Sequence, residues 1–344
     1  MNTIIQRLQP HTVEIYHLEE SQIEEKMVEA KDLLIPSRFD LFAKVYYIRM
    51  WEENRVEAER VYKEHIKAFN PDLREPGRDD KSGYDDFVSS FDQLIDTFKN
   101  QEFDATQSLV PVTEEGVILD GAHRVAALAY FGKKVGIALC KNVKPKAAFD
   151  YIYFKNRGLS WNTMDVIANE MVRWTSNMYV ACLWPKMEDK SKAIALMENR
   201  FGIAYEKKLK VNLKSFQSLI SRVYDNQPWV SEPDSVKFKS LQCYGFNGQI
   251  LFLFFCANSL DEVLAIKDQI RGIYNVGKHS LHITDSIEET RALAKVILDE
   301  TERNIWNASS AVDGMKEKME ERWCYFKNVQ WIHFKASIAK VLKR

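Results

Sequence analysis

The side chains best suited to chemistry lie in the run Asp120-Gly121-Ala122-His123-Arg124. Within five residues this run offers a carboxylate, an imidazole and a guanidinium, between a predicted strand over 117–119 and a predicted helix over 125–131. The first backbone N–H groups of a helix have no partner within the helix, so its start is a ready site for an anion. Such a set of groups suits phosphate recognition or phosphoryl transfer, in which Asp120 would hold Mg²⁺ or orient a hydroxyl.

A purely structural interpretation of the same run stays open. Asp120 can act as the N-cap of the helix, His123 as a half-buried side chain with its hydrogen bonds satisfied, and Arg124 as one half of a surface ion pair. The cluster is denser than helix capping requires, and this density favours a binding site.

A second pattern of strand, acid and helix runs from Lys278 to Glu289. Strand alternation places His282 and His279 on opposite faces, so the two should not bind one metal together. Lys278, His282 and Asp285 are candidate contacts to an acceptor, a diphosphate or Mg²⁺ at the carboxyl end of a sheet. Ser286 and Glu289 match the S-x-x-E capping box, which explains these two residues without any function.

Three further side chains are candidate substrate contacts. Arg74 and Lys81 lie in the polar loop 69–83, which is either a solvated loop or a lid that touches an anionic substrate. Trp184 follows a predicted strand over 179–183 and either stacks on a ligand or belongs to the core.

The elements that would position these residues follow from the periodicity of the apolar side chains. In the first half, we predict helices over 21–68 (with a break at Pro36), 84–100, 125–131 and 145–178, and strands over 109–112, 117–119 and 135–140. In the second half, we predict strands over 179–183, 203–211, 249–257 and 279–284, and helices over 187–199, 213–224, 259–271 and 286–307. This alternation indicates an α/β (α+β) protein with a second α/β domain.

Five segments are expected along the chain. They are a helical N-terminal region with its loop (1–83), a small α/β domain (84–145), a helical connector (146–178), the second α/β domain (179–309) and a C-terminal helical segment (310–344).

Composition excludes several classes of function. The chain has 344 residues, with 48 basic and 49 acidic side chains, so a surface devoted to nucleic acid is not expected. The five cysteines form no CxxC pair, and P-loop, GxGxxG, HExxH and GxSxG motifs are absent. The N-terminus does not resemble a signal peptide, and the longest apolar run, 250–257, is too short to span a bilayer. A cytoplasmic protein is expected, with peripheral membrane association left open.

Residues 87–141, about a sixth of the chain, resemble the ParB/sulfiredoxin-like superfamily. The matching features are Val110-Pro111-Val112, the motif Asp120-Gly121-x-His123-Arg124, the small apolar residues Ala126-Ala127-Leu128, and Gly132. Ala122 stands where sulfiredoxins carry their catalytic Cys, and His123 stands where partition proteins carry a second Arg. The free-serine kinases are therefore the most similar branch.

The resemblance to these kinases implies ATP or another nucleoside phosphate at Gly121, Ala122, His123 and Arg124, with Glu102 or Asp104 as a catalytic base. Over most of its length the chain also looks like uncharacterised proteins of bacterial capsule and lipopolysaccharide synthesis loci, and this likeness implies a sugar or glycan acceptor. The first hypothesis is thus a phosphotransferase that uses Mg²⁺ and ATP. The alternatives are a glycosyl- or phosphoribosyl-type transferase acting on an activated sugar, and a nucleotide-sensing module without catalysis.

Overall fold

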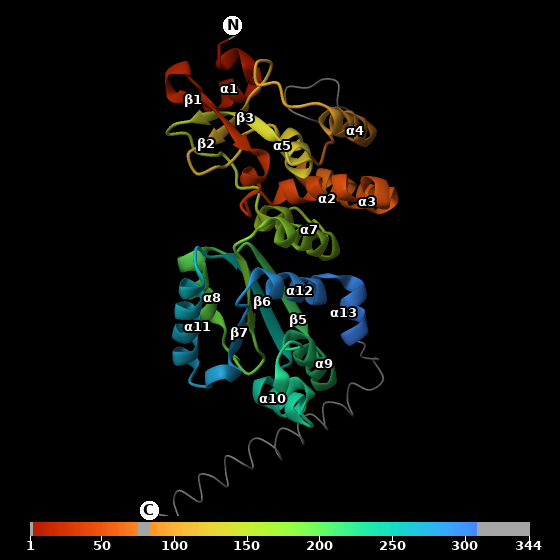
Figure 1. Cartoon of the computed structure of the whole chain (residues 1–344), viewed down its shortest axis with the longest axis vertical. Coiled ribbons are helices and arrows are strands. Elements are labelled where there is room, and N and C mark those ends of the chain that lie inside the picture. The colour runs from red at the N-terminus through yellow and green to blue at the C-terminus, as the bar shows by residue number, and fades with distance from the viewer. Residues whose placement is uncertain (1–2, 75–82, 246, 308–344) are drawn as a thin grey trace, which may run out of the picture. The chain divides into compact units, whose positions relative to one another are not determined.

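The computed structural model describes residues 3–74, 83–245 and 247–307, and the chain divides into two compact units, residues 1–175 and 176–344. Each unit combines helices with a β-sheet, which confirms the predicted α/β class (Figure 1). No helix in the described ranges has both the length and the apolar composition needed to cross a bilayer. The predicted C-terminal helix over 310–344 lies outside the described residues.

The sheet of the first unit consists of β1 (Ile23–Glu29), β3 (Lys134–Cys140) and β2 (Val110–Thr113), in that spatial order. β2 runs parallel to β3, and α5 (Ala122–Tyr130) connects them, so the strands and helix predicted around the Asp120 run form a β-α-β unit. The strand predicted over 117–119 was wrong. Only Ile118 pairs with a neighbouring strand, through a single bridge to Val112, because the chain turns at once into α5.

The helix predicted over 21–68 was wrong in its first part, because residues 23–29 form β1, antiparallel to β3. Met27 fitted a helical spacing, yet its side chain is 51% exposed on the strand. The rest of the segment forms α2 (Phe39–Glu53) and α3 (Arg55–Phe69), which are separated at Asn54. The Asn54 side chain accepts a hydrogen bond from the N–H of Glu57 (3.2 Å) and so begins α3.

The predicted connector helix over 145–178 is two helices, α6 (Tyr151–Asn156) and α7 (Trp161–Trp174). Gly158 between them adopts φ +78°, a left-handed conformation that ends a helix, and the Ser160 hydroxyl then caps α7 by accepting from the N–H of Thr163 (3.3 Å).

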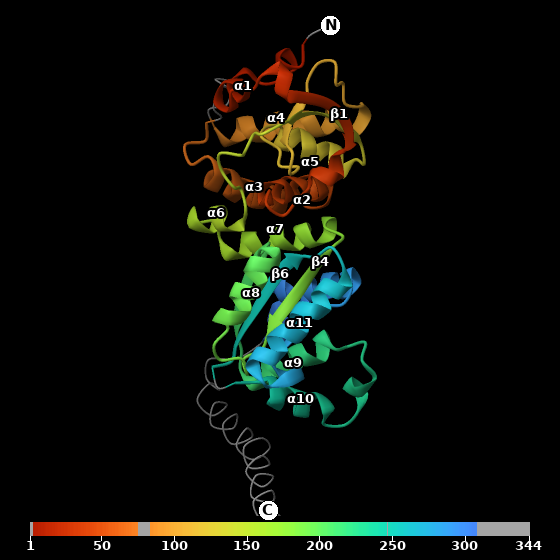
Figure 2. The same ribbon diagram turned by 90° about the vertical axis from the view of Figure 1, so that its left-hand side faces the viewer.

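The first unit is closely packed around α5. Residues 125–129 of α5 are buried, and this helix contacts both α2 and β3 (Figure 2). α2 is buried on all sides from Phe39 to Ile48, as expected of a central helix. The amphipathic α4 (Tyr84–Asn100) matches its prediction and buries Phe87, Phe91, Ile95 and Phe98.

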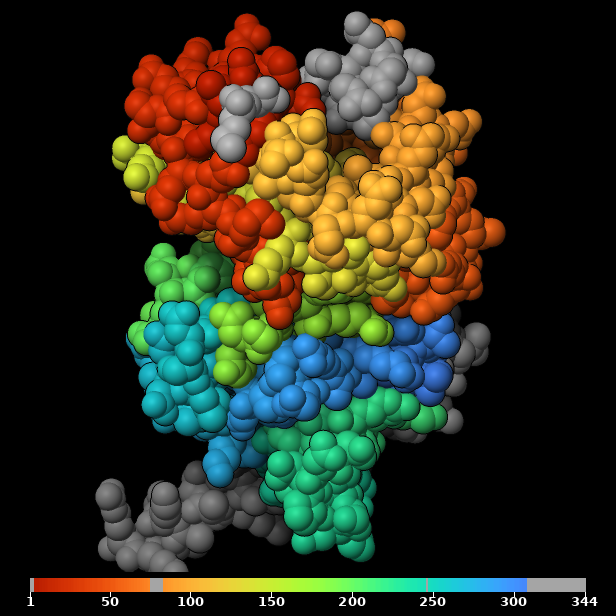
Figure 3. All heavy atoms as spheres, turned by 45° about the horizontal axis from the view of Figure 1, so that its top comes forward, coloured from red at the N-terminus to blue at the C-terminus, as the bar shows by residue number. Residues whose placement is uncertain are grey.

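The N-terminal segment, which includes α1 (Pro10–Tyr16), lies against the residues that follow α4 (Figure 3, red and light orange). The Arg7 guanidinium donates to the carbonyl of Ala105 (2.8 Å), and the Arg7 carbonyl accepts from the N–H of Leu109 (3.0 Å). These bonds fix the N-terminal segment beside β2.

In the second unit the strands lie in the order β5 (Tyr205–Lys210), β6 (Gln249–Cys256), β4 (Met178–Leu183) and β7 (Leu281–Ile283), and neighbouring strands are antiparallel. The carboxyl ends of these strands therefore do not meet at one edge, unlike the arrangement on which the prediction for His282 and Asp285 relied. One face carries α8 (Ser191–Phe201) and α11 (Leu260–Tyr274), and the other carries α9 (Leu213–Val223) and α12 (Ile287–Leu298) (Figure 1).

Two details of this unit differ from expectation. The sequence analysis missed α10 (Ser235–Cys243). The helix predicted over 286–307 is divided at Asp299 into α12 and α13 (Glu300–Trp306), because the Asp299 carboxylate accepts from the N–H of Glu302 (3.0 Å) and caps the second helix.

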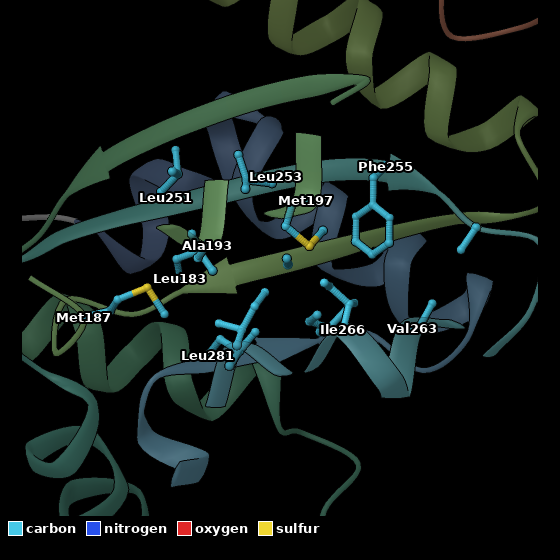
Figure 4. Packing of buried hydrophobic residues seen from close by; sticks show 14 residues of the cluster. Leu183, Met187, Ala193, Met197, Leu251, Leu253, Phe255, Val263, Ile266 and Leu281 are labelled. Carbon is cyan, nitrogen blue, oxygen red and sulfur yellow. The ribbon is translucent and has the colours of Figure 1, made fainter. Parts of the chain in front are cut away.

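The hydrophobic core of the second unit lies between the sheet and α8 with α11 (Figure 4). Leu251, Leu253 and Phe255 of β6 point into it, and Val263 and Ile266 of α11 face them. Residues 250–255 are buried on both faces of β6, as expected for an inner strand between two helical layers.

Candidate functional site

The glycine at position 121 leaves room for the Arg124 guanidinium at the start of α5. Gly121 adopts φ +85°, and a Cβ atom added there would lie 2.9 Å from the Arg124 guanidinium. That guanidinium folds back to the Asp120 carboxylate, with 3.2 Å between Nη2 and Oδ2. Among the described residues, no side chain caps α5. The first N–H groups of the helix and the guanidinium therefore present positive charge at one turn.

His123 is oriented by two aromatic neighbours. Its Nε2 lies 2.8 Å from the Tyr62 hydroxyl of α3, and its ring meets Phe91 of α4 edge-on, with 4.6 Å between ring centroids. These contacts hold the imidazole beside Asp120 and Arg124 at the start of α5.

The residues from Asp120 to Arg124 all line a cavity of about 840 Å³ within the first unit. Among the residues that the structure describes, the cavity walls carry four cations and two acids, namely Arg38, Lys44, Arg124 and Lys146 against Glu14 and Asp120. Aromatic rings form much of the remaining wall, contributed by Tyr16, Phe69, Phe87, Phe91 and Phe149. A cavity that joins an excess of cations to aromatic faces suits an anionic ligand with a planar ring.

A buried charge cluster beside this cavity, formed by Arg38, Asp40 and Lys44, was not predicted from the sequence, and Arg38 and Lys44 of this cluster line the cavity. Asp40 binds Arg38 through both oxygens (2.7 and 2.9 Å) and Lys44 through Oδ2 (3.1 Å). Burial alone would raise the pKa of Asp40, but the charges of Arg38 and Lys44 hold that pKa well below its usual range. A signal was present, since Asp40 and Lys44 are four residues apart in an otherwise apolar run.

Three predicted residues of the first unit lie outside this cavity, and a fourth cannot be placed. The Glu102 side chain is 79% exposed and pairs with Lys133 (3.4 Å), and it is not among the cavity-lining residues. Its alternative, Asp104, binds Thr106 on the surface. Arg74 is exposed and does not line the cavity, and Lys81 lies outside the described residues.

Lys278, His282 and Asp285 line a different cavity of about 1210 Å³, whose walls come from the second unit. His282 is buried, and its Nε2 lies 3.0 Å from Oε1 of Glu289. Asp285 accepts a hydrogen bond from the Lys267 ammonium (2.8 Å). Trp184 is fully buried in the core, edge-on to Phe216, so it is not a stacking surface for a ligand.

The start of α12 in this second cavity is capped, largely as predicted. The Ser286 hydroxyl accepts from the N–H of Glu289 (3.1 Å), and the Glu289 carboxylate accepts from the N–H of Asp285 (2.6 Å). The carboxylate thus reaches one residue beyond its partner in a standard capping box. The N–H of Glu289 in the first turn of α12 is therefore already used within the protein.

Within the described residues, no group of three or more His, Cys, Asp or Glu side chains is arranged to hold a metal ion. The chain matches no family model, no curated protein and no solved structure. Arguments about function therefore start from the two cavities.

Proposed function

We propose that the first unit binds a nucleoside phosphate at the start of α5 and transfers its phosphoryl group to a hydroxyl. The observation that supports this proposal is the uncapped helix start at Gly121, which opens on an aromatic cavity with more cations than acids. The cavity volume, about 840 Å³, also falls within the usual range for small-molecule sites.

Each residue of the turn has a role in this proposal. The backbone N–H groups at the start of α5 and the Arg124 guanidinium would bind the phosphate, because both favour negative charge. His123, whose ring is held by the Tyr62 hydroxyl, would take the proton of the attacking hydroxyl.

Mg²⁺ fits this turn as an ion that arrives with the nucleotide. Mg²⁺ is commonly bound by one or two carboxylates together with phosphate oxygens and water. Asp120 supplies one carboxylate at the right place, and the ion would neutralise charge on the transferred group. ATP is the nucleotide that the resemblance to the free-serine kinases favours.

The acceptor is proposed from the likeness to proteins of capsule and lipopolysaccharide loci. That likeness favours a hydroxyl of a sugar or glycan and a place in bacterial surface-polysaccharide synthesis. The reaction would take place in the cytoplasm, where nucleoside triphosphates are made.

The test is nucleotide turnover by the full-length protein with Mg²⁺ and ATP, CTP, UDP-sugars or phosphoribosyl pyrophosphate. We expect ADP from ATP, with a loss of at least about a hundredfold in Asp120→Asn and His123→Ala. Arg124→Ala should abolish the thermal stabilisation by ATP. The matched control is Asp104→Asn, an exposed acid of the same unit, which should keep full activity. Unchanged turnover in Asp120→Asn and His123→Ala would refute the proposal.

One observation favours a second function, nucleotide sensing without turnover. Asp120 is already paired with Arg124, and Glu102, the predicted base, lies outside the cavity. A sensor would show Arg124-dependent binding of the nucleotide with no product. A product formed only from an activated sugar would instead indicate a glycosyl- or phosphoribosyl-type transferase.

A further inference from the structure

The cavity of the second unit has large apolar side chains on its walls that remain in contact with water. Phe238 of α10 and Leu264 of α11 both line this cavity, and they are 57% and 41% exposed. Trp229 lies on the same walls, in the segment between α9 and α10, with 5.2 Å between its ring centroid and that of Tyr224. Exposed apolar surface gathered in one cavity is typical of a site that a ligand covers.

Polar side chains of α11 line the same cavity. Asp268 and Arg271 are three residues apart on this helix, with 3.6 Å between Oδ1 and Nη1. The Asp268 side chain is 81% exposed, and Nε of Arg271 is buried with no hydrogen-bond partner in the described structure. A carboxylate accepts hydrogen bonds and a guanidinium donates them, so this pair offers both functions to one ligand.

A buried histidine on the cavity wall also has an unused nitrogen. His282 is 8% exposed, and its Nε2 makes no hydrogen bond to any described residue, although a Glu289 oxygen lies 3.0 Å away. The imidazole meets the Tyr224 ring edge-on, with 5.0 Å between centroids. A buried polar atom without a partner is costly, and a hydroxyl of a ligand that reached it would remove this cost.

The charge on the walls distinguishes between classes of ligand. Among the residues that the structure describes, cations and acids line this cavity in equal numbers, five of each. The first turn of α12 is capped by the Ser286 hydroxyl. An anion would favour an excess of cations or an uncapped helix start, whereas an uncharged ligand with many hydroxyls needs acceptors and donors in similar numbers. The walls meet the second requirement.

We propose that the cavity of the second unit binds an uncharged oligosaccharide. The C–H face of a sugar ring is apolar and packs on Trp229 or Phe238, while neighbouring hydroxyls donate to Asp268 and accept from Arg271. At about 1210 Å³ the cavity exceeds the usual range for a drug-sized ligand, so it has room for more than one sugar ring. The proposal concerns the second unit alone and does not depend on nucleotide binding in the first.

Calorimetric titration of the full-length protein with the trisaccharides of glucose, galactose, mannose and N-acetylglucosamine tests this proposal. We expect at least one of them to bind. Its affinity should change less than about twofold between low and high salt, because the ligand forms no ion pair. Inorganic tripolyphosphate, an anion, and adenosine, an uncharged planar ring, should not displace the bound sugar.

Variants of the cavity wall locate the binding site. Phe238→Ala and Asp268→Asn should each weaken sugar binding by at least about fivefold, and both should fold, because the two side chains are exposed. The control for the acid is Asp261→Asn, which changes an exposed residue of the same helix outside the cavity. The aromatic control is Trp161→Ala, at a tryptophan of the first unit that is 45% exposed. Both controls should bind as wild type does.

Tryptophan fluorescence gives a second measurement at the site itself. The bound sugar should change the emission of wild type and of Trp161→Phe. The change should be lost in Trp229→Phe, which keeps an aromatic ring and an affinity within about threefold of wild type.

The possible outcomes also separate this inference from the proposed function. The sugar site is overturned if none of the four trisaccharides binds at up to about 10 mM, if Phe238→Ala and Asp268→Asn bind as wild type does, or if tripolyphosphate or adenosine displaces the sugar. Sugar binding that depends on these residues, without any nucleotide turnover, would support the sugar site and refute the proposed function. Nucleotide turnover without sugar binding would do the reverse.

Discussion

The two units each begin a helix directly after an acidic residue at the edge of a cavity, yet the two helix starts are used differently. At α12 the Ser286 hydroxyl and the Glu289 carboxylate take up N–H groups of Glu289 and Asp285. At α5 the N-cap is Gly121, and no described side chain caps the helix. A similar pattern in the sequence thus produces one helix start with a side-chain cap and one without a cap among the described side chains.

The two cavities also differ in the numbers of cationic and acidic side chains on their walls. Of the described residues, five cations and five acids line the cavity of the second unit, and four cations and two acids line that of the first. Two acids of the second cavity have cationic or imidazole partners at short range, in the pairs Asp285–Lys267 and Glu289–His282. Ion pairs occur in the first cavity too, as in Asp120–Arg124, so the clearer difference is its helix start without a side-chain cap, which favours negative charge.

The largest effect on stability and on ATP binding is expected from Gly121→Ala, which would disrupt the uncapped start of α5. The left-handed backbone costs roughly 1–2 kcal/mol for a residue with a side chain. In addition, the new Cβ would lie 2.9 Å from Arg124 and 3.1 Å from Val110, so the guanidinium must leave its position. We expect a loss of more than about 2 kcal/mol in the free energy of unfolding, together with loss of ATP-induced stabilisation. Urea unfolding and thermal shift measure the two effects.

Gly158→Ala separates backbone strain from the clash with Arg124. Gly158 has a similar φ of +78°, but a Cβ there would meet no atom within 4 Å. This variant should lose roughly 1–2 kcal/mol and keep its response to ATP. If both variants lose the response, the turn at Gly121 has no special part in binding.

A smaller effect is expected from Glu289→Gln at the capped helix start. Burial alone would raise the pKa of Glu289, but the hydrogen bond and charge of His282, the N–H of Asp285 and the charge of Lys267 together lower that pKa below its ordinary 4.5. A carboxyl with a lowered pKa contributes stability above pH 4.5, and this contribution is lost as the pH falls through the lowered value. The amide keeps an acceptor for Asp285 but removes the charge, so the variant should be about 1–2 kcal/mol less stable at pH 7, and this difference should shrink as the pH falls below 4.5.

Urea unfolding from pH 3 to 7 measures this dependence on Glu289. Glu288→Gln is the matched control, because Glu288 lies exposed in the same first turn of α12. Its stability difference from wild type should stay small throughout. A constant difference between Glu289→Gln and wild type at all pH values would show that the charge of Glu289 does not stabilise the second unit.

The sequence predicted those parts of the molecule that depend on local pattern. The amphipathic α4, the β2–α5–β3 order and the caps at Ser286 follow from residues close together in the chain. β1 was misassigned because Met27 happened to fit a helical spacing, while the strand is stabilised by pairing with β3, more than a hundred residues away. Local periodicity cannot report such a partner.

The same distinction applies to the candidate sites. The run from Asp120 to Arg124 was found because its chemistry is contiguous, and these five residues do line one cavity. Tyr62, which contacts His123, is 61 positions away from His123 in the chain. Arg38 contacts the carbonyl of Ile118 near the turn, and only the folded structure brings these two residues together. Glu102 was chosen as a base for its nearness in sequence, but its side chain points to Lys133 on the surface.

The smallest effect on the free energy of unfolding is expected from replacing His65, the buried histidine of the first unit. Its surroundings differ from those of His282, the buried histidine of the second unit. His282 Nε2 lies 3.0 Å from a Glu289 oxygen although the geometry is not that of a hydrogen bond, whereas both ring nitrogens of His65 are buried with no partner in the described structure. Replacing an unsatisfied polar group by an apolar one of similar size is neutral or stabilising. His65→Leu should therefore change the free energy of unfolding at pH 7 by between zero and about +1 kcal/mol.

The pH dependence gives this prediction a second readout. Burial lowers the pKa of His65 in the folded protein, so below pH 6.5 the unfolded chain binds a proton that the folded protein does not. Stability contributed by His65 is then present above pH 6.5 and lost as the pH falls below it, so the leucine variant should lose less stability between pH 7 and 5 than wild type. His11→Leu, at an exposed histidine of α1, is the control and should follow wild type. A His65→Leu protein that is less stable by more than about 2 kcal/mol at pH 7 would mean that the ring makes a hydrogen bond in solution, and the two buried histidines would then be alike rather than different.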